Sequence, residues 1–157
     1  MIHQPSAAFW RGKRVLLTGH TGFKGAWLAL LLEKLGAEVT GFALAPEPGP
    51  SAFVALRPVI ASHIEDLRDA AAVQAVVKGA RPEIVLHLAA QALVGRGYRD
   101  PEGTFASNVT GTINLMQALR GADVRAALMI TSDKVYRNMI KQMNETIRQQ
   151  RHQTPEE

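Results

Sequence analysis

The stretch LLTGHTGFKG, residues 16–25, decides the fold that the sequence predicts. It carries glycines at three-residue intervals, Gly19, Gly22 and Gly25, and it follows a short apolar run typical of a buried strand. Apolar residues then recur at helical spacing as far as Leu35, and Gly36 stands where a glycine favours the end of a helix. A glycine-rich turn between a strand and a helix indicates a site for the phosphates of a dinucleotide. The alternatives are an ordinary glycine-rich turn or an ATP-binding loop, and GxxxxGK[ST] does not occur.

The rest of the chain alternates between strands and helices. The sequence predicts further strands at residues 39–44, 61–65, 84–88 and 126–130, and helices at 70–78 and 101–120. Asp69 is expected to cap the first of these helices and Gly79 to close it, with loops at 45–51 and 91–100. Because the strands are continuous apolar runs, we expect an α/β fold. It would be a truncated, doubly wound parallel sheet of the Rossmann type, with about five strands in the order 3-2-1-4-5 and helices on both faces.

Composition narrows the class of function. The chain has no cysteine, which excludes disulfides and cysteine-ligated metals, and its five histidines form no HxxxH or HExxH pair, so no metal site is predicted. The net charge of +4 comes from dispersed basic residues, which indicates a pocket for an anionic small molecule rather than nucleic acid. No segment approaches the ~18 consecutive apolar residues of a membrane span. We therefore predict a cytoplasmic protein without a membrane or nucleic-acid partner.

Four later motifs, taken with the GxxGxxG spacing, resemble those of the extended short-chain dehydrogenase/reductase family. They follow in order as EDLRD at 65–69, HLAAQ at 87–91, NVTGT at 108–112 and TSDKVY at 131–136. Within the family, the strings FWRGKRVLLTGHTGFKGAWL, HLAAQALV and ITSDKVY are similar to the nucleotide-sugar 4,6-dehydratases that act on CDP-glucose. The resemblance covers about residues 9–138 and implies a nucleotide-sugar substrate.

The resemblance also implies a set of contacts to bound NAD. Asp66 would contact the adenine, and Asn108 would face the sheet. The predicted cofactor-binding residues are Gly19, Thr21, Gly22, Phe23, Lys24, Gly25, Asp66, Leu67, Leu88, Ala89, Ala90, Gln91, Asn108 and Thr131. The second strand ends in FALAP, without the acidic residue that usually binds the ribose, so the sequence does not distinguish NAD from NADP.

The chemistry that the resemblance implies has three stages. The sugar is oxidised at C4, water is eliminated across C5 and C6, and the hydride returns to C6. By position, Asp133 would protonate the leaving 6-hydroxyl, Lys134 would take the place of the base at C5, and Ser132 would bind near O4. The alternative for Asp133 and Lys134 is a solvated pair at a strand end. For His87 we favour a hydrogen-bonded core residue over a ligand or base.

The family's catalytic Tyr-x-x-x-Lys pair is missing from this sequence. Tyr98 is followed four residues later by Glu102, and Tyr136 by Ile140. We expect residues 1–138 to form an NAD-binding domain and 139–157 a divergent tail, with a short helix and then a disordered end. Two interpretations stay open: the NAD-binding part of a dehydratase that is inactive as this chain alone, or a truncated dinucleotide-binding or interaction module without catalysis. Half a sheet exposes its fifth strand, which favours a homo-oligomer.

Overall fold

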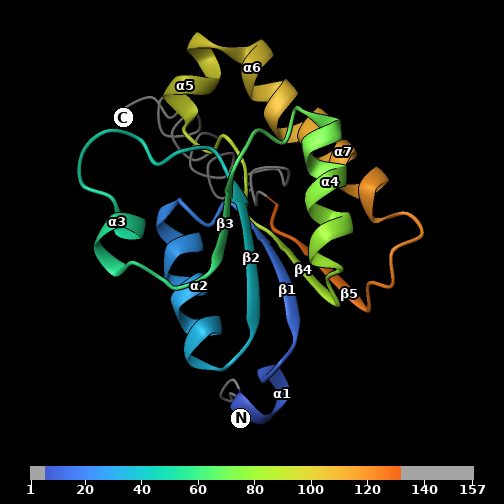
Figure 1. The fold of residues 1–157 in the computed structure, drawn as a ribbon. Coiled ribbons are helices and arrows are strands. Elements are labelled where there is room, and N and C mark those ends of the chain that lie inside the picture. Colours follow the sequence, from blue (N-terminus) through green and yellow to red (C-terminus); the bar gives the residue numbers. More distant parts are fainter. Residues whose placement is uncertain (1–5, 132–157) are drawn as a thin grey trace, which may run out of the picture.

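The computed structural model describes residues 6–131 and contains one five-stranded parallel sheet. The strands follow the spatial order β3-β2-β1-β4-β5, and each pairs in parallel with its neighbours (Figure 1). Their bounds are β1 (Arg14–Thr18), β2 (Glu38–Ala43), β3 (Ala61–Ile64), β4 (Ile84–His87) and β5 (Ala126–Met129). The predicted α/β class, strand number and strand order are confirmed.

Helices cover both faces of this sheet. On one face α2 (Phe23–Lys34) packs against β1, β2 and the short α3 (Ala52–Leu56), and on the other α4 (Ala70–Ala80) packs against α7 (Gly111–Leu119) (Figure 1). The remaining elements are α1 (Ala7–Trp10), α5 (Val94–Arg99), α6 (Pro101–Phe105) and the π-helical turn η1 (Ala106–Thr110). Since α5 and α6 follow the carboxyl end of β4, they lie at the edge of the sheet where the glycine loop also begins (Figure 1).

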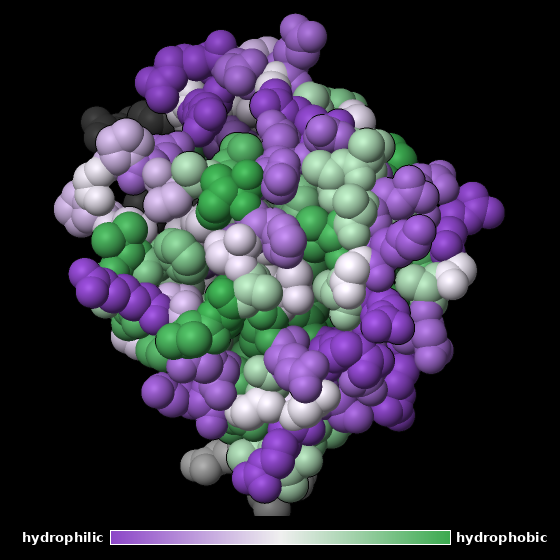
Figure 2. Space-filling view, in the orientation of Figure 1, coloured by the Kyte–Doolittle hydropathy of each residue, from purple (hydrophilic) through white to green (hydrophobic). Residues whose placement is uncertain are grey.

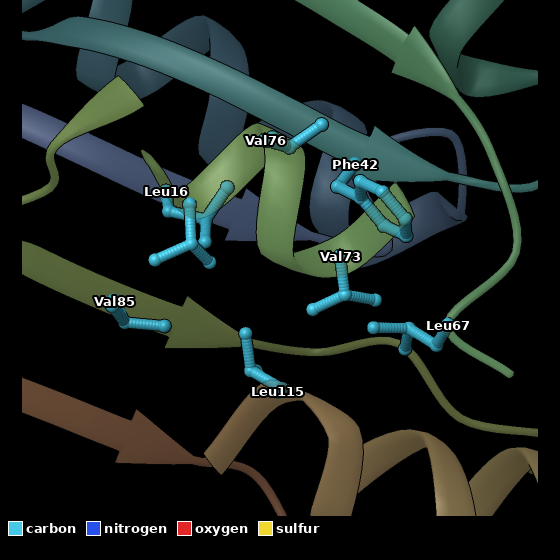
Figure 3. Packing of buried hydrophobic residues seen from close by; sticks show 8 residues of the cluster. Leu16, Phe42, Leu67, Val73, Val76, Val85 and Leu115 are labelled. Atoms are coloured by element: carbon cyan, nitrogen blue, oxygen red, sulfur yellow. The ribbon is translucent and has the colours of Figure 1, made fainter. Parts of the chain in front are cut away.

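The core consists of two clusters, one on each face of the sheet. Successive residues of β1 point to opposite faces, so Leu16 joins one cluster while Val15 and Leu17 join the other. Figure 3 shows Leu16 and Val85 of the sheet meeting Val73 of α4 and Leu115 of α7. Burial on both faces explains why the strands read as continuous apolar runs rather than alternating ones.

The edge strand β3 is less covered than the centre of the sheet. All four of its residues are exposed, and the neighbouring Val59 is 82% exposed. Figure 2 shows hydrophobic patches in the middle of this side of the molecule, with hydrophilic residues towards the rim. Among the described residues no helix is long and apolar enough to cross a membrane.

Helix α4 begins where the sequence predicted but ends later. The side chain of Asp69 accepts hydrogen bonds from the N–H groups of Ala71 and Ala72, at 2.9 and 3.1 Å, so the predicted cap is confirmed. The prediction that Gly79 closes the helix is wrong, because Gly79 lies inside it. Arg81 closes it instead, in the left-handed conformation with φ 43°, and its N–H donates to the carbonyl of Val77.

Two predictions at the carboxyl edge of β4 are also corrected. The expected loop at 91–100 contains α5, whose start is fastened by Gln91: its Oε1 accepts from Leu93 N at 2.7 Å and its Nε2 donates to the carbonyl of Leu93. The single helix expected at 101–120 is instead α6, the π-helical turn η1 and α7 in succession. The π-helical turn shifts the helical register at Asn108, a residue of the predicted site.

Candidate functional site

The glycine loop between β1 and α2 is folded so tightly that side chains are excluded at two of its glycines. Gly19 has φ +77°, and a Cβ there would lie 2.7 Å from the backbone nitrogen of Ala89. A Cβ on Gly25 would collide with the carbonyl oxygen of Gly19. Gly22 N donates to that same carbonyl at 3.1 Å, so the loop closes on itself and brings the start of α2 against the end of β1.

The loop leaves the N-terminus of α2 available to an anion. Gly22 occupies the N-cap position, and no side chain of the described residues caps the helix. The first N–H groups of a helix have no partner within it, and the helix dipole places partial positive charge there. The exposed ammonium of Lys24 adds a full charge beside them. Backbone donors, glycine at the close approaches and a cation together fit a pyrophosphate.

His20 packs the glycine loop onto the neighbouring strands. It is fully buried, its Nε2 lies 2.7 Å from the hydroxyl of Ser62, and its ring meets Phe53 edge-on at 5.1 Å. The ring occupies the space where a Cβ of Gly41 would stand, only 2.6 Å from its Cγ. Burial lowers the pKa of His20. Sequence reasoning missed this residue, because its contacts come from strands 21 and 42 residues further along the chain.

Thr21 fixes the other side of the loop. Its hydroxyl donates to the carbonyl of Leu44 at 2.8 Å, which ties the glycine loop to the end of β2. Phe23, by contrast, is 74% exposed at the first position of α2. Thr21 therefore holds the loop through its side chain. Phe23 contributes its backbone N–H, which lies in the first turn of α2, rather than its exposed side chain.

Asp66 and Leu67 follow β3 at the same edge of the sheet. The guanidinium of Arg68 donates a hydrogen bond from Nη2 to Oδ2 of Asp66 at 2.6 Å, and this hydrogen bond lowers the pKa of Asp66. Leu67 is buried in the core, and Asn114 of α7 donates to its carbonyl at 2.9 Å. Sequence reasoning missed Arg68, although its place two residues after Asp66 is a signal for a local pair.

The segment that follows β4 is held against both the glycine loop and η1. Ala89 lies in contact with Gly19, and its N–H donates to the hydroxyl of Thr18 at 3.2 Å. The side-chain amide of Asn108 accepts from Gln91 N at 2.7 Å and donates to Gln91 O at 3.0 Å. Ala90 lies between these two anchored points, and Leu88 precedes them, with its N–H donating to the carbonyl of Thr18 at 3.2 Å.

His87 is a hydrogen-bonded core residue, as predicted. It is 3% exposed, and both ring nitrogens lie within hydrogen-bond distance of threonine hydroxyls. Thr131 is exposed just beyond β5, at the same edge of the sheet. The predicted catalytic residues Ser132, Asp133 and Lys134 lie outside the described residues.

A separate depression of 560 Å³ lies at the opposite ends of the strands. Its lining includes Arg14, Glu38 and Arg81, and none of the predicted site residues. In the part of the chain that the structure describes, no group of three His, Asp or Glu side chains is placed to hold a metal ion. The arrangement with a definable chemistry is therefore the glycine loop and the segments beside it.

Comparison with known proteins gives consistent matches. The model of the NAD dependent epimerase/dehydratase family matches residues 15–156. The chain is 46% identical over 133 residues to the CDP-glucose 4,6-dehydratase of Salmonella typhimurium strain LT2, covering 83% of this chain and 37% of that protein.

Solved structures match as well. The UDP-glucose 4-epimerase of Thermus thermophilus in complex with NAD is 32% identical with a TM-score of 0.61, covering 70% of this chain and 34% of that one. The UDP-glucose-4-epimerase of Stenotrophomonas maltophila, with bound NAD and formylated UDP-arabinopyranose, is 26% identical with a TM-score of 0.65, covering 78% and 38%. The chain spans less than two fifths of the length of each of these three relatives. The sequence motifs, the sheet order and these matches agree: the chain belongs to the NAD dependent epimerase/dehydratase family.

Proposed function

We propose that residues 1–138 form the NAD-binding part of a nucleotide-sugar 4,6-dehydratase that acts on CDP-glucose, and that 139–157 form a divergent tail. The observation that carries the proposal is the glycine loop, which packs Gly19 against Ala89 and leads into the uncapped N-terminus of α2. The 46% identity to a CDP-glucose 4,6-dehydratase supports the choice of sugar nucleotide. NAD is the cofactor named for the family and present in two of the solved relatives above.

The residues around the loop then have distinct roles. The N–H groups of Phe23 and Lys24 would hold the pyrophosphate, with the Lys24 ammonium balancing its charge. Asp66 would accept a hydrogen bond from the adenine amino group while Arg68 keeps the carboxylate ionised. Residues 88–91, held by Asn108, would form the wall along which the cofactor extends. When bound, NAD would supply the hydride acceptor for oxidation of the sugar at C4 and the hydride for reduction at C6.

The sugar chemistry would come from the segment after β5. Asp133 would protonate the leaving 6-hydroxyl, Lys134 would remove the C5 proton, and Ser132 would hydrogen-bond the sugar near O4. A lysine serves as a base at neutral pH only where burial or neighbouring cations lower its pKa. Neither tyrosine has a lysine four residues further on. We therefore propose that these 157 residues alone do not turn over the substrate.

Calorimetric titration with NAD tests the cofactor site. We expect the chain to bind NAD, and Lys24→Gln to weaken binding about fivefold, more at low salt than at high salt, because a phosphate loses a charged partner. Lys34→Gln is the matched control, since Lys34 lies in the last turn of the same helix, away from the loop. A wild-type chain that does not bind NAD would contradict the proposal.

Incubation with CDP-glucose and NAD tests the catalytic part. We expect no 4-keto-6-deoxy product from the chain alone. Product formation that is lost in Asp133→Asn would support the roles given to the segment after β5 and overturn the proposed inactivity. Product formation that survives Asp133→Asn would contradict both.

A second candidate is an interaction module that binds a dinucleotide without catalysis. The observation that favours it is the exposure of apolar residues on β5: Leu128 is 55% exposed, and Ile130, just beyond the strand, is 48% exposed. An exposed edge strand with apolar side chains favours self-association. Sedimentation over a range of concentrations separates the candidates, because a module of this kind would form a homo-oligomer that Leu128→Lys disrupts.

A further inference from the structure

His87 joins three segments that meet at the proposed cofactor site. It is the last residue of β4, and its Nδ1 lies 2.6 Å from the hydroxyl of Thr18, the residue directly before the glycine loop. Its Nε2 lies 3.0 Å from the hydroxyl of Thr112, in the first turn of α7. One imidazole therefore spans the end of β1, the end of β4 and the start of α7.

The hydrogen bonds around the ring assign its tautomer. The hydroxyl of Thr112 donates to the carbonyl of Asn108 at 2.7 Å, so towards His87 it accepts, and Nε2 carries the hydrogen. The hydroxyl of Thr18 accepts from Ala89 N at 3.2 Å and has its own hydrogen to donate to Nδ1. With hydrogen on Nε2 and Nδ1 accepting, the ring is neutral, and each of its nitrogens has a partner of the required kind. Burial lowers the pKa of His87, which favours this neutral form over the charged one.

At the other end of this series of hydrogen bonds, Asn108 binds Gln91, a residue of the segment 88–91 beside the proposed cofactor site. Asn108 stands in η1, where the helix makes one π-helical turn. The carbonyl of Asn108 accepts from Thr112, while its side-chain amide holds the N–H and the carbonyl of Gln91. The contacts thus run without interruption from Thr18 through His87, Thr112 and Asn108 to Gln91.

We infer that His87, in its neutral Nε2–H form, is a positioning residue for the cofactor site. It sets the distance between the glycine loop, which continues from Thr18, and residues 88–91, which Asn108 holds. It does not contact the cofactor, because it is buried beneath both segments. The inference rests on the proposed binding of NAD at these segments. It adds to that proposal the residue that holds the glycine loop and residues 88–91 at a fixed distance from each other. Breaking either hydrogen bond of the His87 ring leaves a buried ring nitrogen without a partner and lets residues 88–91 shift relative to the glycine loop.

Nitrogen-15 NMR of the histidine rings tests the tautomer without any change to the site. At pH 7 we expect the ring signals that disappear in His87→Gln to be those of a neutral imidazole with hydrogen on Nε2. If those signals instead show hydrogen on Nδ1 alone, or a charged ring, the inference is overturned.

Calorimetry with NAD on three threonine variants tests the positioning role. Thr112→Val removes the hydroxyl at nearly constant shape, and we expect it to weaken NAD binding about fivefold. Thr112→Ser keeps the hydroxyl and should restore affinity to within about twofold of wild type. Thr110→Val is the matched control, because Thr110 is exposed in the neighbouring turn and makes no side-chain hydrogen bond among the described residues.

Two failures are distinguishable in this design. A wild-type chain that does not bind NAD refutes the proposed function itself. A wild-type chain that binds NAD no more tightly than Thr112→Val refutes the positioning role alone. If Thr112→Val does not fold, the same comparison is made with Thr18→Val against Thr18→Ser, which breaks the network at the other nitrogen of His87.

Discussion

Gly41 determines how the glycine loop packs against β2, because it has no side chain. It lies on β2, outside the loop, yet the ring of His20 occupies the position of its missing Cβ. With that ring in place, His20 reaches Ser62 on β3 and packs edge-on against Phe53 of α3. The requirement for glycine at this position is therefore one of space, since the backbone of Gly41 needs no positive φ.

Gly41→Ala should destabilise the chain by about 1–3 kcal/mol, because the added methyl overpacks a buried site and displaces the His20 ring. NAD affinity should fall as well, since the loop shifts with the ring. Chemical denaturation and calorimetry measure the two effects. A variant with wild-type stability would show that the His20 ring moves aside at little cost.

Helix α4 shows how local rules set the stability of a single element. Asp69 caps its first turn through two backbone N–H groups. Asp69→Ala should lower the free energy of unfolding by about 1 kcal/mol, because two donors at the helix start lose their acceptor. Urea denaturation measures the change. Asp69→Asn serves as the control, because it keeps a capping oxygen and should lie near wild type.

The same helix contains a glycine that its structure does not need. Gly79 lies inside α4, is exposed, and has open space where a Cβ would be. Gly79→Ala should therefore raise the free energy of unfolding by about 0.5–1 kcal/mol, since alanine loses less backbone freedom in a helix. Thermal denaturation should show a higher midpoint. A lower midpoint would mean that α4 does not extend to this residue.

At the scale of elements, the sequence predicts what depends on periodicity and local caps. All five strands lie within a residue or two of their predicted positions, because buried parallel strands are continuous apolar runs. The short α3 and α5 were not predicted: each is about one turn long, and Gly95 and Gly97 lower the helix propensity of α5. The π-helical turn carries Asn108, which pairs with Gln91, and a contact 17 residues apart leaves no periodic signal.

The residues of the candidate site fall into the same two groups, those that local sequence predicts and those that depend on contacts between distant segments. The glycines were predicted from their spacing along one segment and Asp66 from the resemblance of EDLRD to a family motif. The structure brings Gly19 against Ala89 at the edge where both were expected. His20, Thr18 and Thr112 were not among the predicted site residues, because their roles arise only when β1, β3, β4 and α7 meet. Local chemistry is readable from one segment of sequence, whereas contacts between strands require the fold.

At the scale of the whole molecule, the two sides of the sheet each bury one neutral histidine. His20 lies over β2 and β3 on the side of α2 and α3, and His87 lies between β4 and α7. Burial lowers the pKa of both imidazoles from an ordinary value near 6.5. Stability is thereby linked to pH through groups on opposite sides of one fold.

The sign of this linkage can be worked out from the two directions. Just below pH 6.5 the unfolded chain takes up protons on these histidines while the folded chain does not, so acid favours unfolding. Stability should be complete above about pH 6.5 and fall as the pH drops further, by at most about 1.4 kcal/mol per pH unit for each imidazole. Below about pH 4 the loss should continue, because the pKa of Asp66 is lowered as well. Urea denaturation at pH 7.5, 6.0 and 5.0 measures how much the free energy of unfolding falls as the pH drops. His87→Gln should make this fall smaller by the contribution of one imidazole. A stability that stays constant from pH 7.5 to 5.0 would mean that neither histidine is held neutral, and the tautomer assigned to His87 would then be wrong too.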